Sequence, residues 1–336
     1  MGGTRLRILT ALLLVLSLCP PRANAQPHLL IVSGLGGDHL HRERFHGWAA
    51  AMFDAATSRF GIPDSNVIYL AESVERDPER IHGRSTKENI ESALSAMSAK
   101  ARPDDKILIL LIGHGSYQGD ESKFSLPGPD MTPQDFAAAL AGFPTQHVAL
   151  VNTASASGDF VGVLSGDRRT IVTATRSPFE RNETVFGQYF VEAFSENVAD
   201  VDHDERVSML EAFEYARREV ERFYEGENRL QTEHAVLDDN GDGEGSSEPD
   251  PATSDGRLAA TFSFDASASF VAEVAGGDPE LAELYRRQRL LQDSLAVLRT
   301  RRDEMEQTTY ETTLEQLLLD LSRVALEIRE RGGGGP

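Results

Sequence analysis

Apolar and polar positions alternate along the first two-thirds of the chain in blocks that predict strands and helices. Apolar runs of strand length are present at His28–Ser33, Asn66–Leu70, Asp105–Ile112, His147–Asn152 and Thr170–Ala174. Helical periodicity is present at Glu43–Phe60, Thr86–Lys100, Thr132–Ala141 and Glu183–Glu196. Strands that are apolar on both faces and alternate with helices predict an α/β fold with an open, mostly parallel sheet. In such sheets, ligands bind beyond the carboxyl ends of the strands.

The pattern changes after this α/β block, which we place at residues 26–225. Residues 226–277 are rich in Gly, Ser, Pro and acidic side chains and are interpreted as an acidic linker, in which the segment "ATFSF" could form an edge strand. Leucines then recur on one helical face over residues 278–331, with a polar break near Gln307–Tyr310, which predicts a helical hairpin or short coiled coil. We expect these helices to pack on the domain or to mediate self-association with a second copy. Residues 332–336 form a predicted disordered tail.

The N-terminus has the pattern of a secretory signal peptide. Two arginines precede an apolar run from Ile8 to Leu18, and small residues end the segment at Ala25. We therefore predict a signal peptide over residues 1–25 and a secreted or periplasmic mature protein. No later run is long and apolar enough to cross a membrane, so that no membrane partner is expected. Cys19 is the single cysteine and leaves with the signal peptide, so that the mature chain has neither disulfides nor thiol chemistry.

The chain is strongly acidic. Its formal net charge is −21, and loss of the three arginines of the signal peptide, which contains no acidic residue, takes the charge to −24. A surface of this kind repels a phosphate backbone, so that we expect no nucleic-acid partner. The same excess of carboxylates favours the binding of cations.

Residues that could take part in catalysis follow two of the predicted strands. The segment "ILLIGHGSY" places His114 between two glycines, and "LVNTASASG" places Ser155 in a run of small and hydroxylated residues. A histidine and a hydroxyl at neighbouring strand tips form the outline of a base–nucleophile pair. The same residues also fit two tight turns that carry no chemistry. Ser155 is not in a nucleophile elbow, because Thr153 stands where that motif requires glycine.

At these residues the sequence resembles the caspase–legumain clan of cysteine peptidases, and its legumain-like branch most. That family has an apolar strand that ends in His-Gly and, about forty to fifty residues on, a strand that ends in Ala-Cys-x-Ser-Gly. Here "GHGS" supplies His114 and Gly115, and "TASASG" supplies Ser155 in the place of the cysteine. The resemblance covers about Pro27 to Ala199. It implies a caspase-like fold and a peptide or protein as substrate or ligand.

The resemblance also implies a substrate pocket. The family's "ATxxxxE" stretch, which shapes that pocket, corresponds to the segment with Arg176 and Glu180. Thr153 stands where legumains have a pocket glutamate, so that asparaginyl specificity is not carried over. The family's arginine after the first strand corresponds to either Arg42 or Arg44.

In the roles that the family implies, His114 takes the hydroxyl proton of Ser155, and the N–H groups of Gly115 and Ser155 form the oxyanion hole. A serine needs a better-aligned base than a thiolate does, usually with a third group that orients it. Asn152 and Asp120 are candidates for that third group. Three interpretations stay open: a hydrolase with a Ser–His dyad, a calcium-stabilised pseudoenzyme that acts as a binding module, and a fold match without the site.

The segment "DVDHDERVSMLE" has the oxygen-ligand spacing of an EF-hand calcium loop. Its ligand positions are Asp200, Asp202, Asp204, Arg206 through its carbonyl, Ser208 and Glu211. The loop departs from the pattern at its sixth position, where Glu205 replaces the usual glycine. We expect this loop to bind calcium as a structural cofactor, the alternative being a solvated acidic loop.

A second acidic run, "DDNGDGEG", has part of the same spacing. Asp238, Asn240 and Asp242 occupy ligand positions, and Gly243 is at the turn where the pattern has glycine. Pro249 stands where the last ligand, a glutamate, belongs. Whether this second loop binds calcium is left open by the sequence.

Overall fold

The structure is a computed structural model that describes residues 25–196, 198–202, 204, 206–264, 271 and 275–332. The predicted signal peptide lies outside these residues except for Ala25, and so does the predicted tail except for Gly332. In the part of the chain that the structure describes, no helix has the length and apolar character that a membrane crossing requires.

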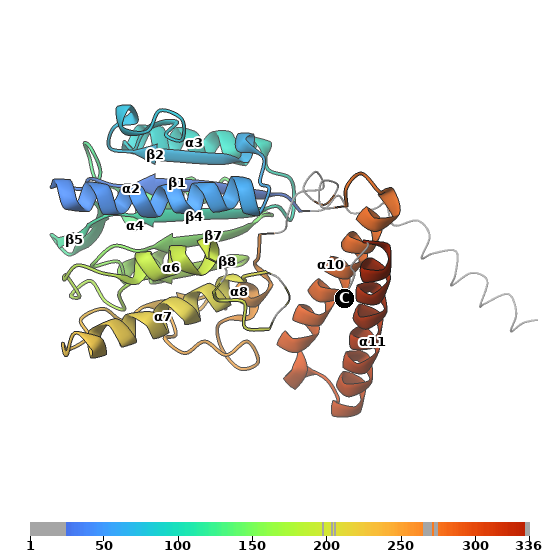
Figure 1. The fold of residues 1–336 in the computed structure, drawn as a ribbon. Helices are drawn as coiled ribbons and strands as arrows, with labels where there is room; N and C mark the ends of the chain where they lie inside the picture. The colour runs from blue at the N-terminus through green and yellow to red at the C-terminus, as the bar shows by residue number, and fades with distance from the viewer. Residues whose placement is uncertain are drawn as a thin grey trace, which may run out of the picture.

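A seven-stranded sheet forms the centre of the molecule (Figure 1). Its strands are β1 (Pro27–Ser33), β2 (Val67–Ala71), β3 (Gly83–Arg84), β4 (Lys106–Ile112), β7 (His147–Asn152), β8 (Arg169–Thr173) and β9 (Val236–Asp238). They lie in the order β3-β2-β1-β4-β7-β8-β9, and every pairing is parallel except that of β8 with β9. The mostly parallel α/β fold predicted from the sequence is therefore confirmed.

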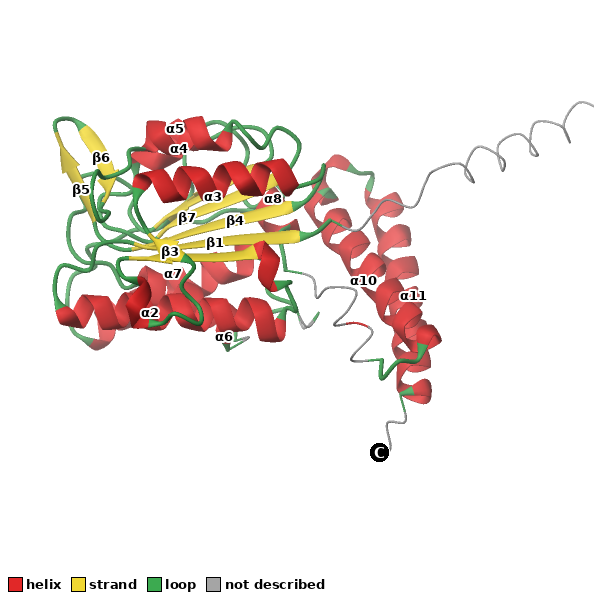
Figure 2. Cartoon of the chain, turned by 90° about the horizontal axis from the view of Figure 1, so that it is seen from above, coloured by secondary structure: helices red, strands yellow, loops and turns green. Residues whose placement is uncertain are grey.

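Helices cover both faces of the sheet (Figure 2). One face carries α3 (Lys87–Lys100), α4 (Pro133–Leu140) and α5 (Asp159–Leu164); the other carries α2 (His39–Asp54), α6 (Phe186–Ser195) and α7 (Met209–Gly226). Alternate side chains of β4 enter the two cores, since Leu108 and Leu110 pack with Phe45 and Phe190, and Ile109 packs with Phe136 on the other face. Burial on both faces explains why β4 is apolar along its length.

Capping side chains set the predicted helix starts. Thr86 caps α3, and Thr132 caps α4 in a reciprocal capping box with Asp135. α2 begins earlier than its periodicity indicated, because Asp38 accepts the backbone N–H of His41 and satisfies the first turn.

Some short strands at the edges of the fold were not predicted from the sequence periodicity. β5 (Gly115–Gln118) and β6 (Glu121–Phe124) form an antiparallel hairpin directly after β4. The edge strands of the sheet are β3 and β9, so that the expectation of an edge strand at "ATFSF" was wrong. That segment contains the end of α8 (Arg257–Thr261) and a single bridge from Ser263 to Ser208.

The predicted helical hairpin is present as α10 (Pro279–Thr300) and α11 (Gln307–Arg331). Asp278 caps α10 by accepting the N–H groups of Glu280 and Leu281. The two helices lie at the end of the sheet opposite to the β5–β6 hairpin (Figures 1 and 2). They are therefore far from the carboxyl ends of the parallel strands, where the candidate catalytic residues lie.

Candidate functional site

The candidate base and nucleophile follow two paired strands. β4 and β7 are parallel neighbours, with residues 107–111 in register with residues 148–152. His114 comes just after β4 and Ser155 just after β7, so that the structure brings them to one edge of the sheet. The hydroxyl of Ser155 donates a hydrogen bond to the carbonyl oxygen of Gly115 over 3.1 Å.

Both glycines beside His114 are required by close contacts. A Cβ on Gly115 would lie 2.0 Å from the carbonyl oxygen of Ser155, and a Cβ on Gly113 would lie 3.0 Å from the ring of Phe124. A side chain at Gly115 would overlap the backbone of the other turn, because a real Cβ does not approach an oxygen so closely. The "GHG" motif therefore permits the two strand tips to pack against each other.

The His114 imidazole is half-buried among other rings. Its centroid lies 4.6 Å from that of His41 and 5.0 Å from that of Phe45, both in edge-to-face geometry. Burial lowers the pKa of His114 below its usual value, the charge of His41 lowers it further, and a hydrogen bond to the backbone of Gly36 opposes them. The neutral imidazole, which can accept a proton, is therefore favoured. Within the described chain, no hydrogen bond joins this ring to Ser155.

Carboxylates hold the neighbouring His41. Its Nδ1 lies 2.9 Å from Asp38 Oδ2, and its Nε2 lies 3.2 Å from Glu183 Oε1. Glu183 also binds Arg44, whose guanidinium lies over the ring of Trp48. The two charged partners fix the orientation of the ring that packs on His114. No local sequence pattern predicts that His41 belongs to this site.

One backbone N–H in the Ser155 turn remains unused. The N–H of Ala154 binds the side chain of Asn152, that of Ala156 binds the carbonyl of Glu180, and that of Ser157 binds the side chain of Thr175. By contrast, the N–H of Ser155 donates to no acceptor in the described part of the chain. An N–H free at the tip of a strand is a candidate donor to an oxyanion.

Neither side chain proposed as a third catalytic group orients His114. Asn152 is buried and accepts the N–H of Ala154, so that it stabilises the turn. Asp120 is exposed at the tip of the β5–β6 hairpin, with a φ of 60°. The groups that act on the His114 ring are instead the Gly36 backbone and the His41 ring.

The residues implied as a substrate pocket have different surroundings. Thr153 is 2% exposed, and its hydroxyl donates to the carbonyl of Leu111. Arg176 is exposed, and its backbone N–H binds the carboxylate of Glu180. Glu180 also accepts the N–H of His234 and lies 2.9 Å from that residue's Nδ1. Thr153 and Glu180 therefore shape the loop, and substrate contact by this set stays a prediction.

Two side chains just before the edge strand β9 bind this loop, through contacts that the sequence did not predict. Glu233, just before β9, accepts the N–H groups of Val185 and Phe186 at the start of α6. Burial raises the pKa of Glu233 to about 7, against the opposing hydrogen bonds. His234 binds Glu180 in the same loop. No local pattern signals these contacts, because the partners are about fifty positions apart in the chain.

An aromatic pair with one exposed ring flanks the Ser155 turn. Tyr117 of β5 packs edge-to-face on Phe179, with ring centroids 5.4 Å apart, and the guanidinium of Arg181 lies over the Tyr117 ring. Phe179 is 71% exposed, which is high for a large apolar side chain. Phe179 and Arg181 belong to the same loop as Arg176, and with Tyr117 they offer an apolar and a cationic surface at the site.

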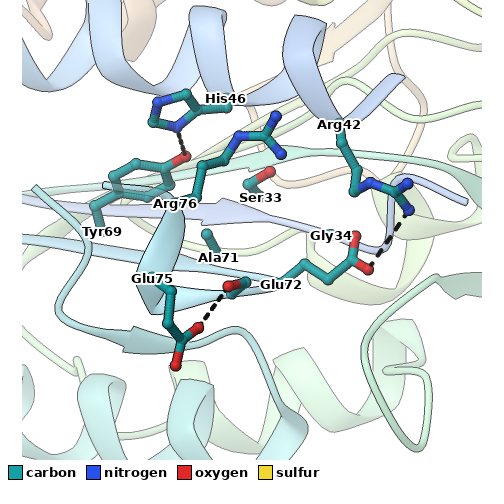
Figure 3. A pocket seen from close by; sticks show the side chains of 10 residues that line it. Ser33, Gly34, Arg42, His46, Tyr69, Ala71, Glu72, Glu75 and Arg76 are labelled. Carbon is teal, nitrogen blue, oxygen red and sulfur yellow. Dashed lines mark hydrogen bonds and ion pairs between the residues drawn. The ribbon is translucent and has the colours of Figure 1, made fainter. Parts of the chain in front are cut away.

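A cavity of about 420 Å³ opens beyond the carboxyl ends of β1 and β2 (Figure 3). Arg42, Glu72, Glu75 and Arg76 contribute to its lining, and so do His46 and Tyr69, which hydrogen-bond to each other. Gly36 joins this cavity to His114, because its N–H binds Glu72 and its backbone contacts the His114 ring. Of the two arginines that could match the family's early arginine, Arg42 therefore lines the cavity and Arg44 contacts Glu183.

The first acidic loop gathers three carboxylates. Oxygen atoms of Asp200, Asp202 and Asp204 lie within 4.8 Å of one another, a spacing that could hold a metal ion. Burial raises the pKa of the Asp204 carboxyl, and the nearby Asp202 adds to this rise, while Arg206 opposes it. The N–H of Asp204 binds Asp200 Oδ1, which closes the loop on its first ligand position.

The remaining positions of that loop are engaged within the protein. Glu211 accepts the N–H groups of Val201 and Ser208 in a capping box of α7 and is not grouped with the aspartates. Arg299 of α10 forms an ion pair with Asp202, and Arg206 pairs with Asp204. Glu205, the departure from the glycine of the pattern, lies outside the described residues.

The second acidic loop leaves β9 and folds back on itself. Asp238 accepts the N–H of Gly241, Asn240 accepts the N–H of Asp242, and Asp242 accepts the N–H of Glu244. These bonds order the three predicted ligand positions along one tight loop.

Comparison with known proteins adds no family assignment. No family model matches the chain, and no curated protein matches its sequence. Among solved structures, it is similar to protein GSU0716 from Geobacter sulfurreducens, with 11% sequence identity and a TM-score of 0.42, over 63% of this chain and 92% of that chain.

Proposed function

We propose that the chain is a secreted hydrolase of peptides or proteins, of the caspase/legumain-like type, with a Ser155–His114 dyad in place of Cys–His. One observation carries the proposal. At the shared edge of β4 and β7, a half-buried imidazole, a hydroxyl and an unused N–H lie on two turns that pack against each other. These are a base, a nucleophile and an oxyanion donor.

In the proposed reaction, Ser155 Oγ attacks the acyl carbon of the substrate while the neutral His114 accepts the hydroxyl proton. The N–H groups of Ser155 and Gly115 stabilise the negative charge on the carbonyl oxygen. The imidazolium then gives its proton to the leaving amine, and water hydrolyses the acyl-enzyme ester by the reverse route. The hydroxyl must first turn from the carbonyl of Gly115 towards His114, because it donates to that carbonyl in the structure.

Labelling with a serine-directed fluorophosphonate tests this proposal. The purified mature chain should incorporate one label, and the labelled peptide should contain Ser155. Ser155→Ala and His114→Ala should both abolish labelling while the circular dichroism spectrum and melting temperature stay close to those of the parent. Ser116→Ala, on the adjacent strand β5, is the matched control and should label normally.

Absence of labelling in the folded parent, in the presence of calcium, would contradict the hydrolase proposal. Peptide cleavage that survives Ser155→Ala would also contradict it, because the nucleophile would then lie elsewhere in the chain.

The alternative is a pseudoenzyme that acts as a binding module. It is favoured by the present position of the Ser155 hydroxyl, which bonds to Gly115 and not to His114. Exposed leucines on the C-terminal helices, among them Leu290 at 63% and Leu326 at 53%, support self-association through these helices. In this case deletion of residues 278–336 abolishes association in analytical ultracentrifugation, and Ser155→Ala leaves it intact.

We further propose that calcium binds the first acidic loop as a structural ion. The grouping of Asp200, Asp202 and Asp204 supports this, because carboxylate oxygens are the ligands that calcium prefers. An ion that binds only the folded state stabilises it by about 2.7 kcal/mol at a free concentration one hundred times its dissociation constant. EDTA should therefore lower the melting temperature of the metal-loaded protein, and Asp202→Asn should reduce this effect. Glu79→Gln, an exposed acid outside the loop, should leave the effect unchanged.

A further inference from the structure

Buried aspartates gather where β9 ends. Asp238 is 1% exposed, Asp239 5% and Asp255 2%, and the exposed Asp242 lies in the same loop. Among the residues that the structure describes, no lysine or arginine forms an ion pair with any of these four side chains. Buried carboxylates are normally paired or bound to a metal, because taking a charge out of water without a partner costs several kcal/mol (about 3–5 when a pair is broken).

Backbone N–H groups satisfy part of this cluster. Asp239 accepts two of them at the start of α8, and Asp255 accepts two from the loop itself. Asp238 accepts the N–H of Gly241 through Oδ1, which turns its carboxylate towards the loop. Its other oxygen, Oδ2, is fully buried and has no hydrogen-bond partner. That oxygen, on a carboxylate that the Gly241 N–H holds against the loop, is an acceptor that the described part of the protein leaves unused.

A second buried oxygen without a hydrogen-bond partner belongs to a residue against which this loop packs. The loop packs on the end of α5, where a Cβ on Gly243 would lie 3.5 Å from the Cα of Gly162 and 3.9 Å from the Cβ of Ser165. The hydroxyl oxygen of Ser165 is also buried without a hydrogen-bond partner. Each unsatisfied buried polar atom costs about 1–3 kcal/mol, so that a ligand bound by Asp238 Oδ2 would remove one such cost.

We propose that the loop of residues 238–244 binds a divalent cation of the calcium class, with Asp238 Oδ2 as its buried ligand. Asn240 and Asp242 supply further oxygens from alternate positions, and Gly243 makes the turn between them with a φ of 79°. The loop's side chains offer carboxylate and amide oxygens and neither nitrogen nor sulfur ligands, a donor set that suits a hard cation. The bound charge neutralises Asp238.

The position of this site connects the ion, through β9, to the loop beside Ser155. β9 runs antiparallel to β8, with Asp238 beside Ile171 and Val236 beside Thr173. Asp238 is therefore at one end of β9, and His234, which binds Glu180, precedes the other end. The cation therefore stabilises one end of β9. At the other end, His234 binds Glu180 of the loop beside Ser155. Binding of the ion at Asp238 does not depend on whether Ser155 is catalytic.

Calcium stoichiometry tests the site directly. The mature chain, stripped with EDTA, is titrated with calcium chloride by calorimetry, with direct metal analysis of the loaded protein. We expect two ions per chain if the first loop also binds, with one ion lost in Asp238→Asn and in Asp242→Asn, and the other lost in Asp202→Asn. Glu248→Gln, an exposed acid of the same segment, is the control and should bind as the parent does. Unchanged stoichiometry in both second-loop variants overturns the proposal.

Stability measured with and without calcium separates a ligand from a structural side chain. Asp238→Asn removes an unpaired buried charge, so that in EDTA the variant should melt no lower than the parent. With millimolar calcium the order should reverse, because only the parent gains the free energy of this binding site. A variant that melts lower than the parent by the same amount in both conditions shows that Asp238 is only structural. The exposed Asp242→Asn repeats the test at a position where substitution leaves the core intact.

Discussion

Gly115 and Ser155 touch through their backbones, so that no side chain fits on Gly115 and the Ser155 hydroxyl bonds to its carbonyl. This contact is what joins the two strand tips into one site. It places the residue after the candidate base against the candidate nucleophile, although 40 positions separate them along the chain.

Substitution of Gly115 by alanine should therefore separate the two turns. The added Cβ would lie 2.0 Å from the Ser155 carbonyl oxygen, and relief of this overlap must move one turn away from the other. We expect a loss of about 1–3 kcal/mol in the free energy of unfolding, measured with urea, and loss of fluorophosphonate labelling. Gly119→Ala, at the tip of the neighbouring hairpin, should retain labelling. Normal labelling of Gly115→Ala would show that the contact does not position the nucleophile.

The pH dependence of labelling should reveal the state of His114. Burial lowers the pKa of this imidazole below its usual 6.5, so that it loses its proton at a lower pH than a free histidine does. Because the neutral ring is the base, the labelling rate should rise with pH with a midpoint below 6.5 and be constant near neutral pH. His41→Gln removes a neighbouring ring that lowers this pKa and should move the midpoint upward. A midpoint at or above 6.5 in the parent contradicts the assignment.

The sheet could be predicted because its strands carry their own signal. β4 is apolar throughout since its side chains enter a core on each face, and Thr132 marks the start of α4 by its own capping bonds. The strand tips were predictable for a related reason. Parallel strands end at one edge, so that His114 and Ser155 had to meet there once β4 and β7 were neighbours.

Long-range contacts explain what the sequence could not reveal. β9 is three residues long and exists through its pairing with β8, so that its own composition carries little information. Glu180 matched a pocket position by its place in a motif, yet its carboxylate is taken by His234, 54 positions away. The direction of the Ser155 hydroxyl depends on the backbone of another turn, which no local pattern encodes.

Competition between arginine and calcium should be measurable at the first acidic loop. Arg299 of α10 forms an ion pair with Asp202, and a bound cation must compete for the same carboxylate. Arg299→Ala should therefore tighten calcium binding about twofold to fivefold in a calorimetric titration, the effect of removing a partly exposed pair. Arg286→Ala, which breaks a pair with Glu283 elsewhere on α10, is the control. Unchanged or weaker binding in Arg299→Ala would mean that Asp202 is not a ligand.

The last prediction concerns Glu233, whose burial raises its pKa to about 7 from an ordinary 4.5. In the folded chain it holds a proton over a range of pH where the unfolded chain has released it. The folded state therefore binds more protons between about pH 4.5 and 7. Linkage requires that this contribution to the free energy of unfolding falls as pH rises through that range, by about 3 kcal/mol in all.

Glu233→Gln cannot ionise and should flatten this part of the curve of unfolding free energy against pH, while Glu227→Gln, an exposed neighbour, should follow the parent. Parallel curves for the parent and Glu233→Gln would contradict a raised pKa of Glu233 in the folded chain.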